Sequence, residues 1–448
     1  MALTPPRSDA RRILWEKDYG RWTVMSAIAA GPHYSSRWGR LIPIAFITYS
    51  LAYVDRANYS LGAAGGMAHD LNIDAAASSL LGALFFLGYF FFQVPAAYYA
   101  EKRSAKELIF WSLILWGIFA AATGLLTDIR LLYVDRFLLG VTESVVLPGM
   151  LIFLGHWFVK AERSRANTFL ILGNPITVLW MSIVSGYLVQ SFGWRGMFII
   201  EGAPPIIWAF VWRAMVNDWP AQAEWLDPNE RVELERKLED EQRQFKPVRD
   251  YAAAFRTPMV ITLAIQYFCW SVGVYGFVIW LPSMLKAAGE TSIVLVGWLS
   301  AGPYLAAAAL MIIGSYFSDA SGNRKNFVWP FLLIGAVAFY GSYLLGTSSF
   351  WLGYGLLVVA GGTMYAPYGP FFAWIAETLP RNVAGGAIAL INCCGALGSF
   401  VGSYFVGWLN GVTGSSDASY LFMAVALLAS ALLTLTLRGH ADAPAPAL

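Results

Sequence analysis

An acid and a base stand side by side at Asp55 and Arg56, inside the apolar stretch LAYVDRANYS of residues 51–60. A charged side chain at the centre of a membrane helix costs at least about 2.5 to 3.5 kcal/mol on insertion scales, so such a pair needs a function. A buried carboxyl group can bind and release a proton, whereas arginine stays charged and its planar fork fits a carboxylate. We therefore expect Asp55 to carry a proton and Arg56 to bind an anion. The alternative for Arg56 is a fixed ion pair with Asp55 or Glu143, since charges inside membranes usually pair.

A second pair of charges lies in the stretch DRFLLGVTESVVLPGM, where Arg136 precedes Glu143 by seven residues. Seven residues make almost two helical turns and rise roughly 10 Å, so both side chains point the same way at different depths. We expect Glu143 near the middle of the membrane and Arg136 nearer its outer surface. Tyr53 lies three residues before Arg56 on the same helical face, and it could offer a phenol to the same anion.

Three further polar residues lie within apolar stretches. Asn174 precedes Pro175, where a broken helix could expose backbone groups to a cavity. Asn392 lies in a glycine-rich stretch, and a contact with another helix is about as plausible there as one with a sugar hydroxyl. Glu201, which stands beside Gly202, could equally serve packing or function.

The composition is typical of a membrane protein, because only 13% of the 448 residues are charged, against roughly 25% in soluble domains. The net charge of +2 gives no reason to expect nucleic acid as a partner, and no Walker-type glycine loop supports ATP-driven transport. The chain has four histidines and no evident cluster of metal ligands or nucleophile with a base. We therefore expect neither an enzyme nor a bound metal or cofactor.

Apolar runs of about 20 residues can cross a bilayer as helices, and the sequence contains twelve of them. We predict an all-α membrane protein with two six-helix bundles, at residues 41–215 and 257–438. The predicted spans are 41–62, 78–100, 107–126, 129–154, 166–190, 196–215, 257–283, 292–318, 326–347, 350–376, 381–408 and 418–438.

The basic residues predict how the chain sits in the membrane. Lys and Arg gather in cytoplasmic loops, and placing both termini inside leaves only Arg130, Arg195 and Lys286 in outer loops. Residues 1–40 and 439–448 then form cytoplasmic tails of a protein in the inner membrane.

A polar linker, residues 216–256, joins the two bundles and contains the sequence LDPNERVELERKLEDEQRQ. Asp227 as N-cap and Pro228 at the first helical position predict a charged helix there. The linker is either a solvated connector or a binding site for a partner, and charge runs favour the connector.

A polar signature recurs at the ends of spans two and eight, as AAYYAEKRSAK and GSYFSDASGNRK. It resembles the loop signature of the major facilitator superfamily, in which an acid and a base follow conserved glycine positions. In the first copy Glu101 is the acid and Lys106 the base, and Ala97 and Ser104 stand at the glycine positions. In the second copy Asp319 is the acid and Arg324 the base; Gly322 is kept and Ser315 stands at the other glycine position. An acid at a helix end can pair with a basic group of a neighbouring helix only while that side is closed. We therefore predict that Glu101, Asp319 and Arg324 take part in gating; the alternative is ordinary loop charge.

The resemblance extends over residues 41–438 and to one branch of the superfamily. YVDRANYS, the spacing of Arg136 and Glu143, and ALINCCGALGSFVG are similar to the anion:cation symporters, and LPRNVAGGAIALIN is similar to their rhamnonate-type permeases. This resemblance implies proton-coupled uptake with Asp55 and Glu143 as proton sites. We expect Arg136 to serve as a charge partner of these acids. The resemblance also implies a substrate site at the membrane midline made of Tyr53, Arg56, Tyr89, Asn174 and Asn392, with Phe372 where some relatives have Trp.

These observations together predict a monomeric transporter that imports a small hydroxylated monocarboxylate with protons by alternating access. A sugar acid such as L-rhamnonate or a galactonate fits the resemblance. The alternatives are another organic anion, such as a dicarboxylate or an aromatic acid, and a transporter-like sensor that binds without translocating. The expected partners are therefore the organic anion, protons and the lipid bilayer.

Overall fold

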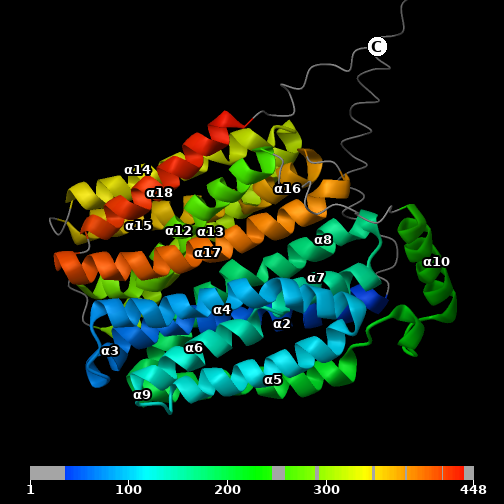
Figure 1. Ribbon diagram of the computed structural model, residues 1–448, viewed down its shortest axis with the longest axis horizontal. Helices are drawn as coiled ribbons and strands as arrows, with labels where there is room; N and C mark the ends of the chain where they lie inside the picture. Colours follow the sequence, from blue (N-terminus) through cyan, green and yellow to red (C-terminus); the bar gives the residue numbers. More distant parts are fainter. Residues whose placement is uncertain are drawn as a thin grey trace, which may run out of the picture.

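The computed structural model describes residues 36–244, 258–287, 292–345, 349–378, 381–415 and 417–437, and all regular structure in these ranges is helical (Figure 1). Helices of the first half of the chain gather on one side, and those of the second half lie beside them. Residues 1–35, 245–256 and 439–448 of the predicted tails and linker lie outside the described ranges.

The first half of the chain supplies the helices of the first bundle. A short linker helix, α10 (Pro228–Gln244), follows it after the turn η2 (Pro220–Gln222). The helices of the bundle are α2 (Ser36–Gly62), η1 (Ala63–Met67), α3 (Ala68–Asp70), α4 (Ala75–Lys102), α5 (Ala105–Thr123), α6 (Ile129–Glu143), α7 (Val146–Trp157), α8 (Lys160–Ile171) and α9 (Gly173–Met215). Within α9 the chain turns at Gly193, whose φ of 69° lies in the left-handed region that favours glycine, so α9 holds parts of two predicted spans.

The second half of the chain supplies the second bundle. Its helices are α12 (Pro258–Ala287), α13 (Ile293–Ser321), η3 (Arg324–Phe327), α14 (Trp329–Leu345), α15 (Phe350–Tyr365), α16 (Tyr368–Thr378), α17 (Arg381–Thr413) and α18 (Asp417–Thr436). α15 and α16 are separated at Ala366 and Pro367, where the missing proline N–H interrupts the helical hydrogen bonds.

Several helices begin where the sequence offers a capping side chain. Asp74 accepts a hydrogen bond from the Ala77 N–H at 2.7 Å at the start of α4. Asp227 does the same for α10, accepting from the Asn229 N–H at 2.9 Å and the Glu230 N–H at 3.2 Å. The predicted start of the linker helix at Pro228 is therefore confirmed.

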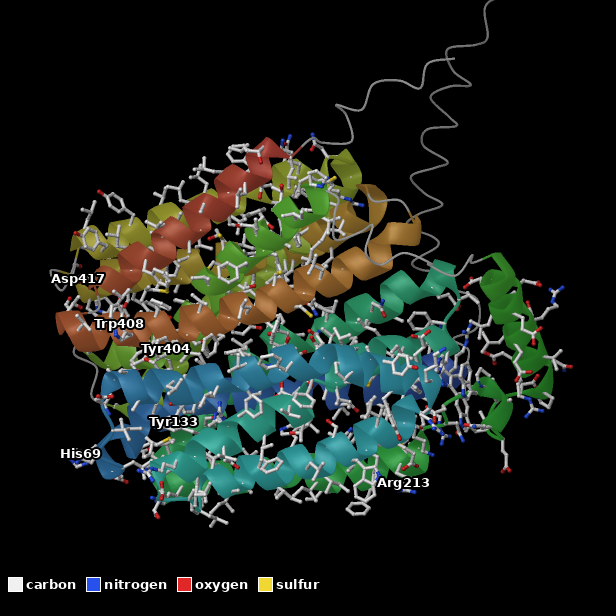
Figure 2. All side chains as sticks on the ribbon, in the orientation of Figure 1. His69, Tyr133, Arg213, Tyr404, Trp408 and Asp417 are labelled. Atoms are coloured by element: carbon white, nitrogen blue, oxygen red, sulfur yellow. The ribbon has the colours of Figure 1, made fainter. Side chains whose placement is uncertain are left out.

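The outside of the helices is apolar, as in a protein surrounded by lipid. Nine helical segments in the described ranges are long and apolar enough to cross a membrane, and one of them, Phe169–Met215, covers one predicted span and most of another. Large apolar side chains such as Trp111, Phe210 and Ile312 are exposed along these helices. Figure 2 shows His69 and Asp417 at one end of the molecule and Arg213 toward the other.

The two halves meet closely at the end of the molecule that carries η1, called here the η1 end. Lys286, at the end of α12, donates a hydrogen bond to the Ala64 carbonyl in η1. α9 and α13 cross at glycines, because a Cβ on Gly297 would lie 2.5 Å from the Ser182 carbonyl oxygen. These contacts join the bundles at and near this end.

The opposite end, called here the α10 end, holds the linker against the first bundle. Arg37 of α2 forms salt bridges with Glu162 of α8, at 3.0 Å, and with Glu230 of α10, at 3.4 Å. The Trp157 indole donates to the Asn217 carbonyl at 3.0 Å. These contacts anchor the linker to the first bundle.

Candidate substrate cavity

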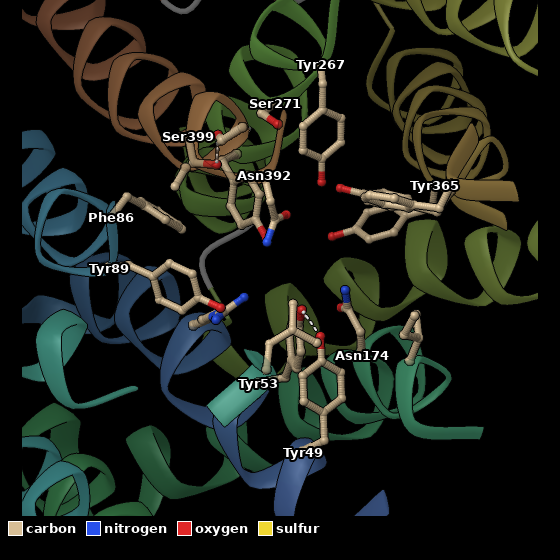
Figure 3. Close-up of a pocket in the computed structure, with 18 of the residues that line it drawn as sticks. Tyr49, Tyr53, Phe86, Tyr89, Asn174, Tyr267, Ser271, Tyr365, Asn392 and Ser399 are labelled. Atoms are coloured by element: carbon tan, nitrogen blue, oxygen red, sulfur yellow. Dashed lines mark hydrogen bonds between the residues drawn. The ribbon is translucent and has the colours of Figure 1, made fainter. Parts of the chain in front are cut away.

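A cavity of about 270 Å³ lies between the two bundles, lined by α2, α4, α7, α8 and α9 on one side and by α12, α13, α15, α16 and α17 on the other (Figure 3). Its wall includes every residue for which the sequence predicted substrate binding. These residues are Tyr53, Arg56, Tyr89, Asn174, Phe372 and Asn392.

Arg56 brings the positive charge of this wall, since it is the only Lys or Arg among the described lining residues. Helical spacing places it on one face of α2 with Tyr49 and Tyr53, whose hydroxyl oxygens are 3.1 Å apart. The guanidinium carbon lies 4.5 Å from the ring centre of Tyr53 and 5.1 Å from that of Tyr89. The aromatic faces therefore support the cation in a site largely closed to solvent.

Glu143 holds the guanidinium of Arg56. Its Oε1 accepts from Nε at 2.7 Å and lies 2.6 Å from Nη2. The Glu143 Oε2 has no hydrogen-bond partner among the described residues. Glu143 is the last residue of α6, and the helix resumes as α7 at Val146, shortly before Pro148. Of the two ion pairs considered for Arg56, the structure contains the one with Glu143.

Asp55 does not line the cavity, although it is next to Arg56 in the sequence. It is 1% exposed and accepts hydrogen bonds from the Asn58 amide, at 3.0 Å, and from the Trp116 indole. Neighbouring residues of an α-helix point about 100° apart, so the acid and the base face different sides of α2. The sequence analysis missed Asn58 and Trp116; the spacing of Asp55 and Asn58 by three residues could have indicated the first.

Arg136 is also buried and lies behind the wall. Its Nε donates to the Leu81 carbonyl at 3.4 Å, and its guanidinium carbon lies 4.5 Å from the ring centre of Tyr59. Its Nη1 has no hydrogen-bond partner in the described part of the chain. The adjacent Asp135 accepts from the Thr123 hydroxyl at 2.7 Å, a contact that sequence reasoning did not identify.

Aromatic residues dominate the side of the cavity formed by the second bundle. Tyr267, Tyr365 and Phe372 line it, and Figure 3 shows Tyr267 and Tyr365 facing Asn174 across the space. The Tyr267 ring stacks on Phe371, with ring centres 5.4 Å apart. Three polar residues of α12 reach the cavity, namely Tyr267, Ser271 and Tyr275. The Gln266 amide instead donates to Ser430 at 2.9 Å within the bundle.

The predicted gating residues lie at the α10 end, away from the cavity. Glu101 is exposed near the end of α4. The Arg324 Nη1 donates to the Ser318 hydroxyl at 3.3 Å, a contact between η3 and the end of α13 in the second bundle. The Asp319 side chain lies outside what the structure describes. No salt bridge among the described residues involves Glu101, so its gating role stays a prediction.

Two helical bundles with a cavity of aromatic and polar side chains between them have the architecture of a membrane transporter. Residues 45–296 and 290–447 match the Major Facilitator Superfamily, and the chain belongs to this superfamily. The relatives and the fold are those of transporters and not of enzymes.

Three relatives each match about nine-tenths of the chain. A protein of Agrobacterium vitis that is named for tartrate transport is 31% identical over 89% of this chain and 93% of its own length. The inner membrane transport protein RhmT of Escherichia coli (strain K12) is 29% identical over 89% of this chain and 94% of its own. GudP of Bacillus subtilis (strain 168), named for galactarate and D-glucarate transport, is 26% identical over 92% and 94%.

Solved structures share the fold. A D-xylose-proton symporter superimposes with a TM-score of 0.71 at 14% identity, over 90% of this chain and 98% of its own. An inward-facing bacterial homologue of the human lysosomal transporter Spinster gives 0.68 at 18%, over 88% and 94%. The predicted fold of twelve membrane helices in two bundles is therefore confirmed.

Proposed function

We propose that this protein imports a small organic anion together with protons. The observation that carries the proposal is the contact between Arg56, on the wall of the cavity, and Glu143 behind it. A substrate carboxylate and Glu143 compete for the same guanidinium. Protonation of Glu143 removes its charge, so Arg56 becomes available to the substrate. By linkage, the proton strengthens anion binding as much as the anion strengthens proton binding.

The cavity wall favours a hydroxylated monocarboxylate as the substrate. One cation among the described lining residues matches one carboxylate, and a second carboxylate would meet no further positive charge there. Hydroxyl groups of the substrate would find partners in seven tyrosines, in asparagines and in serines: Tyr49, Tyr53, Tyr89, Tyr267, Tyr275, Tyr365, Tyr368, Asn167, Asn174, Asn392, Ser271 and Ser399. A sugar acid such as L-rhamnonate or a galactonate has this chemistry.

Specific observations also favour two other classes of substrate. The relatives named for tartrate and for galactarate and D-glucarate favour a dicarboxylate, and the rings of Tyr267, Tyr368 and Phe372 would suit an aromatic acid. A sensor that binds without translocating is the alternative from a different class of protein.

The transport cycle follows from the arrangement of the bundles. Residues 41–215 and 257–438 would rock about the cavity in the inner membrane as a monomer, with both termini and the α10 end in the cytoplasm. The η1 end would then face outward, where the contacts of Lys286 and Gly297 would close it. Glu101, Asp319 and Arg324 would pair across the cytoplasmic side when it closes.

The test combines binding and uptake. Purified protein is screened by thermal shift with aldonates, uronates and aldarates, and each ligand found is then measured as radiolabelled substrate in proteoliposomes under an inward pH gradient. We expect aldonates to bind and to accumulate. Binding without accumulation would favour the sensor, and preference for aldarates would contradict the assignment of a monocarboxylate.

A further inference from the structure

The groups that hold the positive charge of the cavity all belong to the first bundle. Arg56 of α2 contacts the rings of Tyr53 and Tyr89 and the carboxylate of Glu143, and these residues lie on α2, α4 and α6. A ligand shifts the balance between conformations only through contacts that differ between them. A donor from the second bundle at this place would therefore couple the binding of a carboxylate to the movement of the bundles.

Helix α12 brings side chains of the second bundle to the cavity beside α2. Tyr267, Ser271 and Tyr275 recur every four residues on one face of α12, and all three line the cavity. α12 packs against α2, and the two helices end at the same place. There Lys286, near the end of α12, donates to the Ala64 carbonyl just beyond the end of α2.

The distance along each helix from this contact gives the depth of each side chain. Arg56 precedes Ala64 by eight residues, or about 12 Å of helical rise. Tyr275 precedes Lys286 by eleven residues, or about 17 Å, whereas Tyr267 precedes it by nineteen, or about 29 Å. Tyr275 therefore lies near the depth of Arg56, and Tyr267 lies much further from the η1 end.

Ring contacts also place Tyr275 beside the aromatic groups that support Arg56. The ring centres of Phe85 and Tyr89 of α4 lie 5.5 and 5.1 Å from the guanidinium carbon. The ring centre of Phe86 lies 5.1 Å from that of Phe85 and 4.6 Å from that of Tyr275. Figure 3 shows Phe86 and Tyr89 on the same side of the cavity. Tyr275 thus reaches the end of the cavity that carries the cation.

The Tyr275 hydroxyl is available to a ligand. Tyr275 lines the cavity, and within the described part of the chain its hydroxyl makes no hydrogen bond. The hydroxyls of Tyr49 and Tyr53, in contrast, already pair with each other at 3.1 Å. A phenol is a neutral donor, and its hydrogen bond to a carboxylate is roughly twice as strong as one to a neutral group.

We propose that Tyr275 is the contact of the second bundle to the bound anion: its hydroxyl donates to the substrate carboxylate that Arg56 holds. The carboxylate then joins α2 to α12, so that binding draws the two bundles together around the cavity. This inference rests on the proposed function in one respect, namely that the substrate is a carboxylate that contacts Arg56. It applies equally to a monocarboxylate and to a dicarboxylate.

The test compares the Kd of the purified protein for D-galactonate and for D-galactonamide, in which a neutral amide replaces the carboxylate. Tyr275→Phe keeps the ring beside Phe86 and removes the donor. We expect D-galactonate to bind roughly 10-fold to 100-fold more weakly to this variant, because a hydrogen bond to a charged group is lost. Binding of D-galactonamide should weaken only about threefold, so the preference for the acid over the amide falls.

Tyr365→Phe is the matched control, since it removes the hydroxyl of another buried tyrosine of the second bundle that lines the cavity. Figure 3 shows Tyr365 across the cavity from Tyr89. This variant should keep the wild-type preference for the acid over the amide, whatever it does to both affinities. Wild-type affinity for the acid in Tyr275→Phe, or an equal loss for the acid and the amide, would overturn the proposal.

Uptake of D-galactonate into proteoliposomes under a pH gradient tests the proposed function separately. If wild type binds the acid and does not accumulate it, import with protons fails, and the two dissociation constants still decide the role of Tyr275. The melting temperature of Tyr275→Phe without ligand should equal that of wild type, which shows that a lost affinity does not come from a damaged fold.

Discussion

Replacement of Arg56 by lysine should weaken substrate binding although the positive charge is kept. In the structure two nitrogens of the guanidinium contact one carboxylate oxygen, at 2.6 and 2.7 Å, and its plane lies against two tyrosine rings. A substrate carboxylate that takes the place of Glu143 would use the same fork.

The size of the effect follows from these contacts. An ammonium group would make one of the two contacts that the guanidinium nitrogens make with the carboxylate, and a hydrogen bond to a charged group contributes about 1.5 to 3 kcal/mol. The loss of ring contact adds about 0.5 to 1 kcal/mol. Together the change is about 2 to 4 kcal/mol, which corresponds to roughly a 30-fold to 1,000-fold weaker apparent affinity.

The assay measures the apparent KM for uptake in proteoliposomes and the Kd of the purified protein for the same ligand. Arg213→Lys serves as the matched control, because Arg213 lies in the same bundle with its side chain 48% exposed and away from the cavity. The control should behave as wild type. Wild-type affinity in Arg56→Lys would refute the role of Arg56 as the anion-binding group.

Three further predictions concern coupling, charge and packing. Glu143→Gln and Asp55→Asn should abolish accumulation under a pH gradient and leave exchange at equal pH, because an amide mimics the protonated acid; either variant concentrating substrate like wild type would exclude that acid from coupling. If both acids deliver a proton with a monovalent anion, each cycle moves one net positive charge inward, and a negative-inside potential contributes about 2.3 kcal/mol per 100 mV. A potassium–valinomycin potential at equal pH should then drive accumulation, and vesicles that respond to pH alone would show that one acid carries no proton. Gly297→Ala should lower the melting temperature in detergent, at a cost of about 1 to 3 kcal/mol, because its Cβ would meet the Ser182 carbonyl at 2.5 Å; Gly353→Ala, with nothing within 4 Å, should not.

The composition of the cavity could be predicted because buried charge is costly in a membrane. Arg56 and Glu143 stand out in apolar segments for that reason alone, and the resemblance to a symporter family supplied Asn174 and Asn392. The spans followed from apolar length, which a bilayer imposes on every helix. The break at Ala366 and Pro367 divides the predicted span 350–376 into two helices, α15 and α16, but it does not add a span.

The partners of the charged groups could not be predicted in this way. Glu143 is 87 residues from Arg56, and their contact depends on how α2 and α6 are rotated against one another, which the packing of many side chains sets. The orientation of Asp55 away from the cavity could have been predicted, since neighbouring residues of a helix point about 100° apart and Arg56 faces the cavity. Of the actual partners of Asp55, Asn58 lies three residues away on the same helix, whereas Trp116 belongs to α5 and reaches Asp55 only in the assembled bundle.

On the proposed mechanism, the two faces of α2 couple proton binding to transport in different ways. On the cavity face Arg56 has one fork and two possible partners, Glu143 and the substrate, so a change in the charge of Glu143 is felt directly as a change in affinity. On the other face Asp55 meets no substrate and is held by Asn58 and Trp116. A proton on Asp55 can therefore act on the substrate only through α2 itself, by changing how the helix packs against α5 and α9. This arrangement predicts that Asp55 affects the movement between conformations, whereas Glu143 affects affinity within one of them.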